Sequence, residues 1–185
     1  MIHLVFNRPS GHLKIFRDDG SPWDMIDAGG DAWGSTPQAA PYGFYYPIRP
    51  GHYVLEAPLR NMPPLEAEGA WKIPVVDINA AVLKTLVDTG RAAPAGPDHA
   101  IGHITLPVGN LARDGRTEVL IHGGGSNLPK HGLDPFGAYQ KLTKTHGCTR
   151  VHNADLARIV AFVQGAPDGN TIVYSVVGDP IKLPY

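Results

Sequence analysis

Apolar residues alternate with polar ones in short runs along the first third of the chain, a pattern typical of β-strands. The runs 3–7 and 12–18 flank the turn Arg8-Pro9-Ser10-Gly11, and a third run follows at 23–28. Residues 43–55 then combine a bend with a further apolar run. The pattern predicts that this part of the chain consists of short strands joined by turns.

Helical spacing of apolar residues appears in three places. The segment 79–88 is preceded by a candidate N-cap, Asn79, and followed by a candidate stop, Gly90. The segment 153–164 has the strongest pattern, with Asn153 as a candidate cap and Gly165 as a candidate end. The apolar face of this helix is predicted to hold Leu156, Ile159, Val160 and Val163. A third, short helix is predicted over 136–144.

Further strands are predicted over 100–107, 118–122 and 170–177, with a Gly-rich loop over 123–135. We find no internal repeat and no stretch with the composition of an interdomain linker. The chain is therefore predicted to be a single α+β domain over residues 1–185, mostly β, with two or three helices.

Composition excludes several classes of protein. Of the 185 residues 43% are hydrophobic and 18% charged, and the formal net charge is −1. Without a basic cluster, nucleic acid is not an expected partner. No apolar stretch approaches the roughly 20 residues of a membrane-spanning helix. The first residues lack the pattern of a secretory signal, which leaves the export route open.

The candidate chemistry centres on the single cysteine, Cys148, which lies in Thr145-His146-Gly147-Cys148-Thr149-Arg150. A thiolate is the reactive form of cysteine, and neighbouring His146 and Arg150 charges would lower the thiol pKa. In an extended segment, residues two apart project to the same side. Gly147 allows close approach of a substrate, and the backbone N–H groups of Gly147 and Cys148 are candidates for an oxyanion hole.

A cysteine nucleophile also needs a base. His122 ends the apolar run 119–121 and is followed by Gly123-Gly124-Gly125, whose backbone carries no side chains. A histidine at the end of a strand, followed by such a loop, is well placed to line a site. We therefore predict that His122 acts as the base for Cys148.

Together these segments resemble the catalytic domain of the L,D-transpeptidases, the YkuD-like family. The resemblance rests on His122-Gly123 followed by Thr145-His146-Gly147-Cys148 and Arg150. The fragment 47–53 is similar to the Pro-Gly turn and strand that precede them in the family. The resemblance implies a mostly β, sandwich-like domain with a helix after the cysteine motif.

The resemblance also implies the role of each residue in the site. Cys148 matches the nucleophile, and His122 matches the general base, which the carbonyl of Gly123 orients. His146 and Gly147 match positions that line the oxyanion hole and the substrate site. The remaining two matched residues are Arg150, expected to support the site or bind a substrate carboxylate, and Thr145, at the family's Ser/Thr position.

The implied reaction is acyl transfer on peptidoglycan. The substrates would be tetrapeptide stems, with D-amino acids as possible acceptors and carbapenem β-lactams as inhibitors that acylate Cys148. No cofactor is implied, and the site of action would be the periplasm or cell envelope. Transpeptidation, carboxypeptidation and D-amino-acid exchange all remain open, as do the acceptor and the oligomeric state.

Two features depart from the simplest form of the family. The segment 123–144, between His122 and Thr145, is longer than usual and forms a lid, an altered acceptor pocket or a surface insertion. The N-terminal segment 11–21 resembles that of antibacterial effectors with the same acyl-transfer chemistry. Action on a competitor's cell wall is therefore one alternative. A non-catalytic wall-binding module and a cysteine protease of another substrate class are the others.

A metal site is a further possibility, but the sequence does not favour one. His99 and His103 have a spacing that binds zinc on a helix. Gly102 and the prolines at 97 and 107 disfavour a helix there, and no third ligand is obvious.

Overall fold

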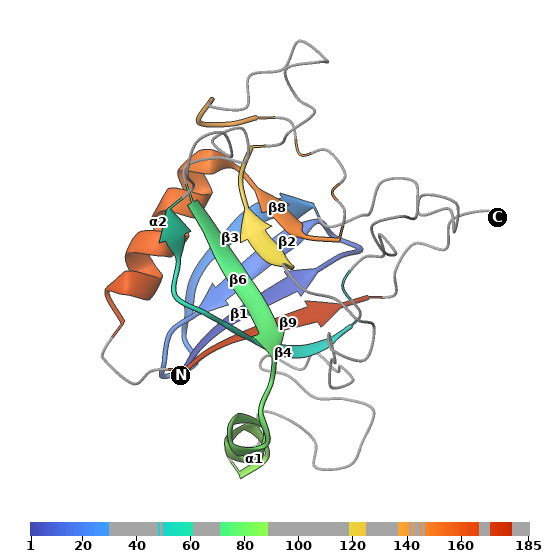
Figure 1. The fold of residues 1–185 in the computed structure, drawn as a ribbon, viewed down its shortest axis with the longest axis vertical. Coiled ribbons are helices and arrows are strands. Elements are labelled where there is room, and N and C mark those ends of the chain that lie inside the picture. The colour runs from blue at the N-terminus through green and yellow to red at the C-terminus, as the bar shows by residue number, and fades with distance from the viewer. Residues whose placement is uncertain are drawn as a thin grey trace, which may run out of the picture.

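The described residues of the chain fold into a closed, mostly β structure accompanied by two helices (Figure 1). This computed structural model describes residues 1–29, 48, 50–60, 71–88, 119–124, 137–140, 142, 145, 147–166 and 171–178. The strands are β1 (Ile2–Asn7), β2 (His12–Phe16), β3 (Pro22–Gly29), β4 (Gly51–Leu55), β5 (Leu59–Arg60), β6 (Trp71–Asp77), β7 (Leu120–His122), β8 (Thr149–Val151) and β9 (Ile172–Val177). The helices are α1 (Ala80–Asp88) and α2 (Asn153–Gln164).

The nine strands of the described residues form one sheet that closes on itself. Its order is β4-β9-β1-β2-β3-β8-β7-β6-β5. An additional pairing of β4 with β6 closes eight of these strands into a ring, and β5 pairs with the start of β6. The β1–β9 and β7–β8 pairs are parallel, and the other pairs are antiparallel. In Figure 1, β6 and β7 cross in front of β1, β2 and β9, so two sides of the sheet face each other. The predicted mostly β, sandwich-like fold with two helices is confirmed.

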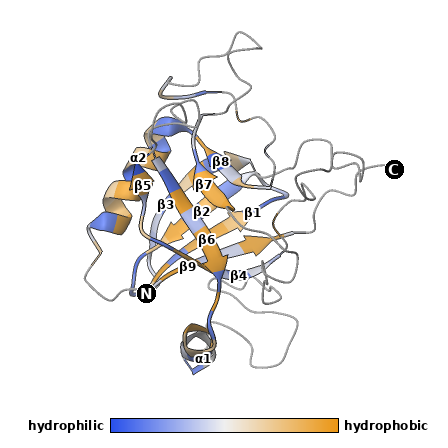
Figure 2. Ribbon diagram, viewed as in Figure 1, coloured by the Kyte–Doolittle hydropathy of each residue, from blue (hydrophilic) through white to orange (hydrophobic). Residues whose placement is uncertain are grey.

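The space inside the closed sheet is filled by alternate residues of the strands. On β1 the inward residues are Ile2, Leu4 and Phe6, which belong to a core cluster that also holds Tyr53 and Tyr174. All five are at most 4% exposed. Figure 2 shows the corresponding hydrophobic colouring along β1, β6 and β7. The period-two alternation read from the sequence is therefore the alternation of core and outer face.

Helix α2 spans Asn153–Gln164 as predicted. It packs beside the part of β3 that does not pair with β8. Strand β8 pairs only with the last two residues of β3. Beside the earlier part of β3, Trp23 stacks on Phe162 with ring centroids 4.2 Å apart, and Asp24 forms an ion pair with Arg158. The four apolar residues predicted to face the core, Leu156, Ile159, Val160 and Val163, are all buried.

The start of α2 differs from the prediction. Asn153 is the first helical residue and not the N-cap; His152 holds that position and makes no capping bond with its side chain. The first backbone donors of the helix instead reach a neighbouring segment: the amide of Asn153 donates to Gln140 Oε1, and that of Ala154 to the Ala138 carbonyl, both at 3.0 Å. Tertiary contacts thus satisfy donors that a capping side chain usually satisfies.

The third predicted helix, over 136–144, is wrong for its described part. Residues 137–139 form a series of bends, and Gln140 is not helical either. Gln140 holds this segment by donating from Nε2 to the Val151 carbonyl at 3.0 Å, and Asn153 Nδ2 donates to the Gly137 carbonyl at 3.0 Å. The polar groups of the segment bond to β8 and α2, which accounts for the absence of helical turns there.

Helix α1 begins as predicted. Asn79 Oδ1 accepts the amide of Val82 at 2.9 Å, the bond of an N-cap. Val82 and Ile78 pack with Met1 against Val173 of β9, so the helix covers the outer face of the sheet at this end. The predicted strand 100–107 and the stop at Gly90 lie outside the described residues.

Strand β7 is tied to α2 by a close contact at Gly123. A Cβ atom on this residue would overlap Oδ1 of Asn153, whose side chain is itself held by the segment 137–140. We expect Gly123→Ala to lower the free energy of unfolding by about 1–3 kcal/mol, because the amide of Asn153 has to move out of a packed position. Chemical denaturation measures this change.

Gly29→Ala is the matched control, since this glycine also lies in the sheet beside the same site. A Cβ there would meet Leu142 at 3.7 Å, an ordinary contact. We expect its effect to stay within about 0.5 kcal/mol. Equal destabilisation by the two substitutions would contradict the proposed contact.

Candidate active site

The parallel pairing of β7 with β8 brings together the two segments singled out in the sequence. Ile121 lies opposite Thr149, and His122 lies opposite Arg150. Cys148 directly precedes β8, one strand away from His122 and offset by two residues. With strands about 4.8 Å apart and a rise of about 3.3 Å per residue, their Cα atoms are separated by roughly 8 Å, which side chains can bridge.

The side chains of this region divide between two faces of the sheet. Ile121, Thr149 and Val151 are at most 1% exposed and point into the barrel. Alternation then places His122 and Arg150 on the outer face. Cys148, one residue before Thr149, falls on that same face as far as the extended conformation continues. The cysteine, the imidazole and the guanidinium are therefore on one side, opposite the core.

His122 is held in one orientation by its own neighbour. Its Nδ1 lies 2.7 Å from the carbonyl oxygen of Gly123. A carbonyl only accepts, so Nδ1 carries the proton in this bond and Nε2 of the neutral ring is the proton acceptor. The predicted orientation of His122 by the Gly123 carbonyl is present in the structure.

The surroundings of His122 keep the imidazole neutral. The ring is buried, with the residue only 5% exposed. Burial lowers its pKa from 6.5 to about 4, the charges of Arg150 and Lys72 act in the same direction, and the bond to Gly123 acts against them. At neutral pH the ring is therefore a neutral imidazole and not an imidazolium.

The backbone around Cys148 is shaped by Thr145. The threonine hydroxyl donates to the Cys148 carbonyl at 2.6 Å and accepts the amide of Gly147 at 3.2 Å. Gly147 has φ +117°, a conformation that residues with a Cβ rarely adopt. Thr145 thus closes a tight turn that presents the half-buried Cys148 at the start of β8.

The turn affects the predicted oxyanion hole, in which the amide of Gly147 is one of the donors. Its amide already has an acceptor in Thr145, so an oxyanion would have to share this donor or displace the hydroxyl. The amide of Cys148 follows directly in the chain and is the second predicted donor. His146, also predicted for the site, lies outside the described residues.

Strand β8 is fixed to the opposite side of the barrel below the site. Thr149 Oγ1 and the Tyr174 hydroxyl are 2.5 Å apart. The pKa of Tyr174 is raised, first by burial, with a smaller contribution in the same direction from a charge on Cys148. Tyr174 therefore lies within electrostatic range of the cysteine and helps to set the position of its strand.

Lys72 is a residue of this region that the sequence did not single out. It pairs with His122 across β6 and β7, as Arg150 does across β7 and β8. Ile73 next to it points into the core, so Lys72 belongs to the outer face. Only the strand register could have identified it, because nothing in the sequence around Trp71-Lys72 resembles a catalytic motif.

The described residues offer no alternative centre of metal chemistry, since they hold no group of three or more metal-ligating side chains. His99 and His103, the pair with a zinc-like spacing, lie outside them. Within the same ranges, no helix is long and apolar enough to cross a bilayer.

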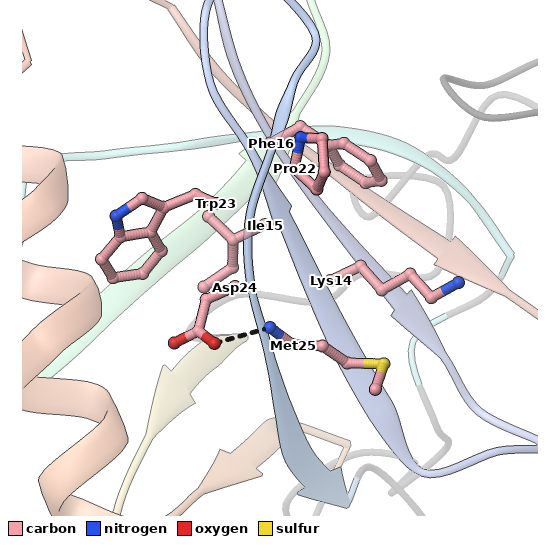
Figure 3. Close-up of a pocket in the computed structure, with 7 residues that line it drawn as sticks. All are labelled: Lys14, Ile15, Phe16, Pro22, Trp23, Asp24 and Met25. Atoms are coloured by element: carbon pink, nitrogen blue, oxygen red, sulfur yellow. Dashed lines mark hydrogen bonds between the residues drawn. The ribbon is translucent and has the colours of Figure 1, made fainter.

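A pocket of about 480 Å³ lies on β2 and β3 (Figure 3). Its lining residues are Lys14, Ile15, Phe16, Pro22, Trp23, Asp24 and Met25. They occupy the end of β3 remote from β8, and Asp24 is already paired with Arg158. The lining offers no nucleophile with a base beside it, so the pocket is not the candidate active site.

Comparison with solved structures finds matches of low sequence identity, among them one with a TM-score of 0.50. Bd1075 of Bdellovibrio bacteriovorus aligns with a TM-score of 0.50 and 12% identity, covering 95% of this chain and 47% of that one. The helical cell shape determining protein Pgp2 of Campylobacter jejuni gives 0.49 and 15%, covering 98% and 49%. L,D-transpeptidase 1 of Mycobacterium tuberculosis gives 0.39 and 13%, covering 96% and 61%.

The chain spans about half the length of the first two of these proteins. No curated protein matches the sequence significantly. The family comparison is decisive, because the L,D-transpeptidase catalytic domain (YkuD) matches residues 2–183. The chain therefore belongs to the L,D-transpeptidase catalytic domain family, which confirms the resemblance first drawn from the cysteine motif.

Proposed function

We propose that the chain is a cysteine acyltransferase that acts on peptidoglycan stem peptides through an acyl-enzyme on Cys148. The observation that carries the proposal is the fixed imidazole of His122, whose Nε2 is available as a base on the strand next to the cysteine. Membership of the L,D-transpeptidase family supports the substrate class. The site of action would then be the periplasm or cell envelope.

The reaction follows from these two groups. His122 Nε2 takes the thiol proton as Cys148 Sγ attacks the carbonyl carbon between an L-centre and a D-centre of a tetrapeptide stem. Collapse of the tetrahedral intermediate breaks the C–N bond, and His122 returns the proton to the departing D-amino acid. A thioester on Cys148 remains.

The second half repeats the proton transfers in reverse. An acceptor amine attacks the thioester, its proton passes to His122, and the C–S bond breaks with return of the proton to sulfur. An amine of another stem gives a cross-link, a free D-amino acid gives exchange, and water gives carboxypeptidation. Because His122 is neutral at rest, the proposal is general-base activation of a thiol and not a preformed ion pair.

The remaining site residues have supporting roles in this proposal. The backbone N–H groups of Cys148 and Gly147 stabilise the oxyanion, and Thr145 positions the turn that carries them. His146 completes the substrate site, and Arg150 supplies a positive charge beside His122. Residues 1–185 act as one domain, since β9 near the end of the chain pairs with β1 at its beginning.

The nucleophile is tested by Cys148→Ala. We expect kcat/KM on a tetrapeptide stem to fall at least about 10³-fold, since no other group forms the thioester. Intact-protein mass spectrometry should detect a carbapenem adduct on the unaltered chain and none on the variant. Full activity in the variant would overturn the proposal, and retained wall binding without any turnover by the unaltered chain would favour a binding module.

The neutral state of His122 is tested by titration. NMR of the imidazole should show protonation at about pH 4, because burial and two cations oppose it, with His122→Gln assigning the signal. The acid limb of kcat/KM should follow the same pKa.

Stability should depend on pH through the same residue. The unfolded chain takes up this proton below about pH 6.5 and the native chain only below about 4, so lowering the pH through this window favours unfolding. A titration near 6.5 would contradict the lowered pKa of His122 and its burial.

The positioning role of Thr145 is tested by a pair of variants. Thr145→Val keeps the shape but loses the hydroxyl that links Gly147 to the Cys148 carbonyl, and we expect kcat/KM to fall about ten- to hundredfold through misplacement of the sulfur. Thr145→Ser keeps the hydroxyl and should retain most activity. Equal losses in the two variants would contradict this role of the hydroxyl.

A further inference from the structure

Three polar residues form a row across the outer face of β6, β7 and β8. Lys72 pairs with His122, and His122 pairs with Arg150, so a cation stands on each side of the base. Directly paired residues of neighbouring strands point to the same face of a sheet. Lys72 therefore extends the candidate active site by one strand, to β6, on the side of His122 away from Cys148.

Lys72 brings a positive charge that the rest of the described structure does not neutralise. None of the ion pairs formed among the described residues includes it. Its side chain is half-buried, and its charge reaches His122. A lysine without an anionic partner in the described parts of the chain, placed next to a catalytic base, is suited to meet a negative charge on the substrate.

The proposed chemistry specifies where such a charge would lie. The nitrogen of the departing D-amino acid must come within hydrogen-bond distance of His122 to receive its proton. In a tetrapeptide, the terminal carboxylate is two bonds from that nitrogen, at about 2.5 Å from it to the carboxyl carbon. The carboxylate consequently lies within a few ångströms of His122, where the row places its two cations.

The order of the strands separates the two cations. Arg150 lies on β8, the strand that Cys148 precedes, whereas Lys72 lies on β6, beyond His122 as seen from the sulfur. The acyl group stays at Cys148 and the departing group extends past His122. Lys72 is thus on the side toward which the departing group leaves.

Resting on the proposed function, we propose that Lys72 binds the terminal carboxylate of the departing D-amino acid and so restricts the donor to stems that end one residue after the scissile bond. A longer stem has a peptide group at this point, and an amidated stem has a neutral one. Neither offers a charge to Lys72. The residue is therefore a determinant of specificity and takes no part in the bond changes.

The experiment compares two substrates that differ only in this charge, a tetrapeptide stem and its C-terminal amide. We expect the unaltered chain to prefer the free acid by about tenfold or more in kcat/KM, as for a charge-assisted hydrogen bond. Lys72→Met, which keeps the alkyl chain, should lose about ten- to hundredfold on the acid and little on the amide. Lys72→Arg should retain most of the preference.

Lys14→Met is the matched control, because Lys14 is an exposed strand lysine on β2, outside the row. It should leave both substrates unaffected. If Lys72→Met lowers the rates on acid and amide equally, Lys72 acts only on His122 or on stability, and the proposal is overturned. The acid limb of the kcat/KM profile against pH gives an independent check. If Lys72 acted only through His122, Lys72→Met would shift this limb equally for both substrates.

Binding separates this proposal from the function on which it rests. In the Cys148→Ala background, calorimetry should find tighter binding of the free acid than of the amide, and the added change Lys72→Met should abolish the difference. If the unaltered chain turns over neither substrate yet this preference is found, the proposed reaction fails and the carboxylate site stands. Turnover without any acid preference would uphold the reaction and overturn the carboxylate site.

Discussion

The parallel pairing of β7 with β8 is the constraint on which the site depends. It joins a histidine and a cysteine that are 26 positions apart in the sequence. A parallel pair has to be connected by a crossover, so the topology requires a connecting segment between the two strands. Closure of the sheet holds the pair on both sides, with β6 beside β7 and β3 beside β8.

Burial decides the protonation state of His122. Water is largely removed from His122, two cations stand beside it, and a single carbonyl fixes its tautomer. Burial and the two cations favour a neutral imidazole, whereas the carbonyl raises the pKa of His122 and selects the tautomer with Nε2 as acceptor. At the end of β3, next to β8, a Cβ atom on Gly29 would contact Leu142.

Helix α2 connects the site to the remainder of the core. Its buried face fills the barrel wall beside β3, while its first turn is hydrogen-bonded to the segment 137–140. The missing Cβ of Gly123 lets Asn153 approach the end of β7. The helix therefore positions the strand ends that carry the candidate catalytic residues without contributing a reactive group itself.

The sequence by itself determined the elements and the reactive pair. Alternation and helical spacing are local properties, so β1, β2, β3 and the two helices could be read from them, and the motifs around His122 and Cys148 indicated a family. Two local predictions failed at one place: the cap at Asn153 and the helix over 136–144. There the polar groups of Gln140 and Asn153 bond across the fold, and local preference is overridden.

Only the tertiary structure decided which strands are neighbours and on which face each side chain lies. Lys72 is the clearest case, because its relation to His122 exists through the register of β6 and β7 and has no trace in the local sequence. The lowered pKa of His122 also depends on the tertiary structure, because burial is a property of the assembled sheet. Spacing along a chain encodes local conformation, whereas proximity across strands arises only when the barrel closes.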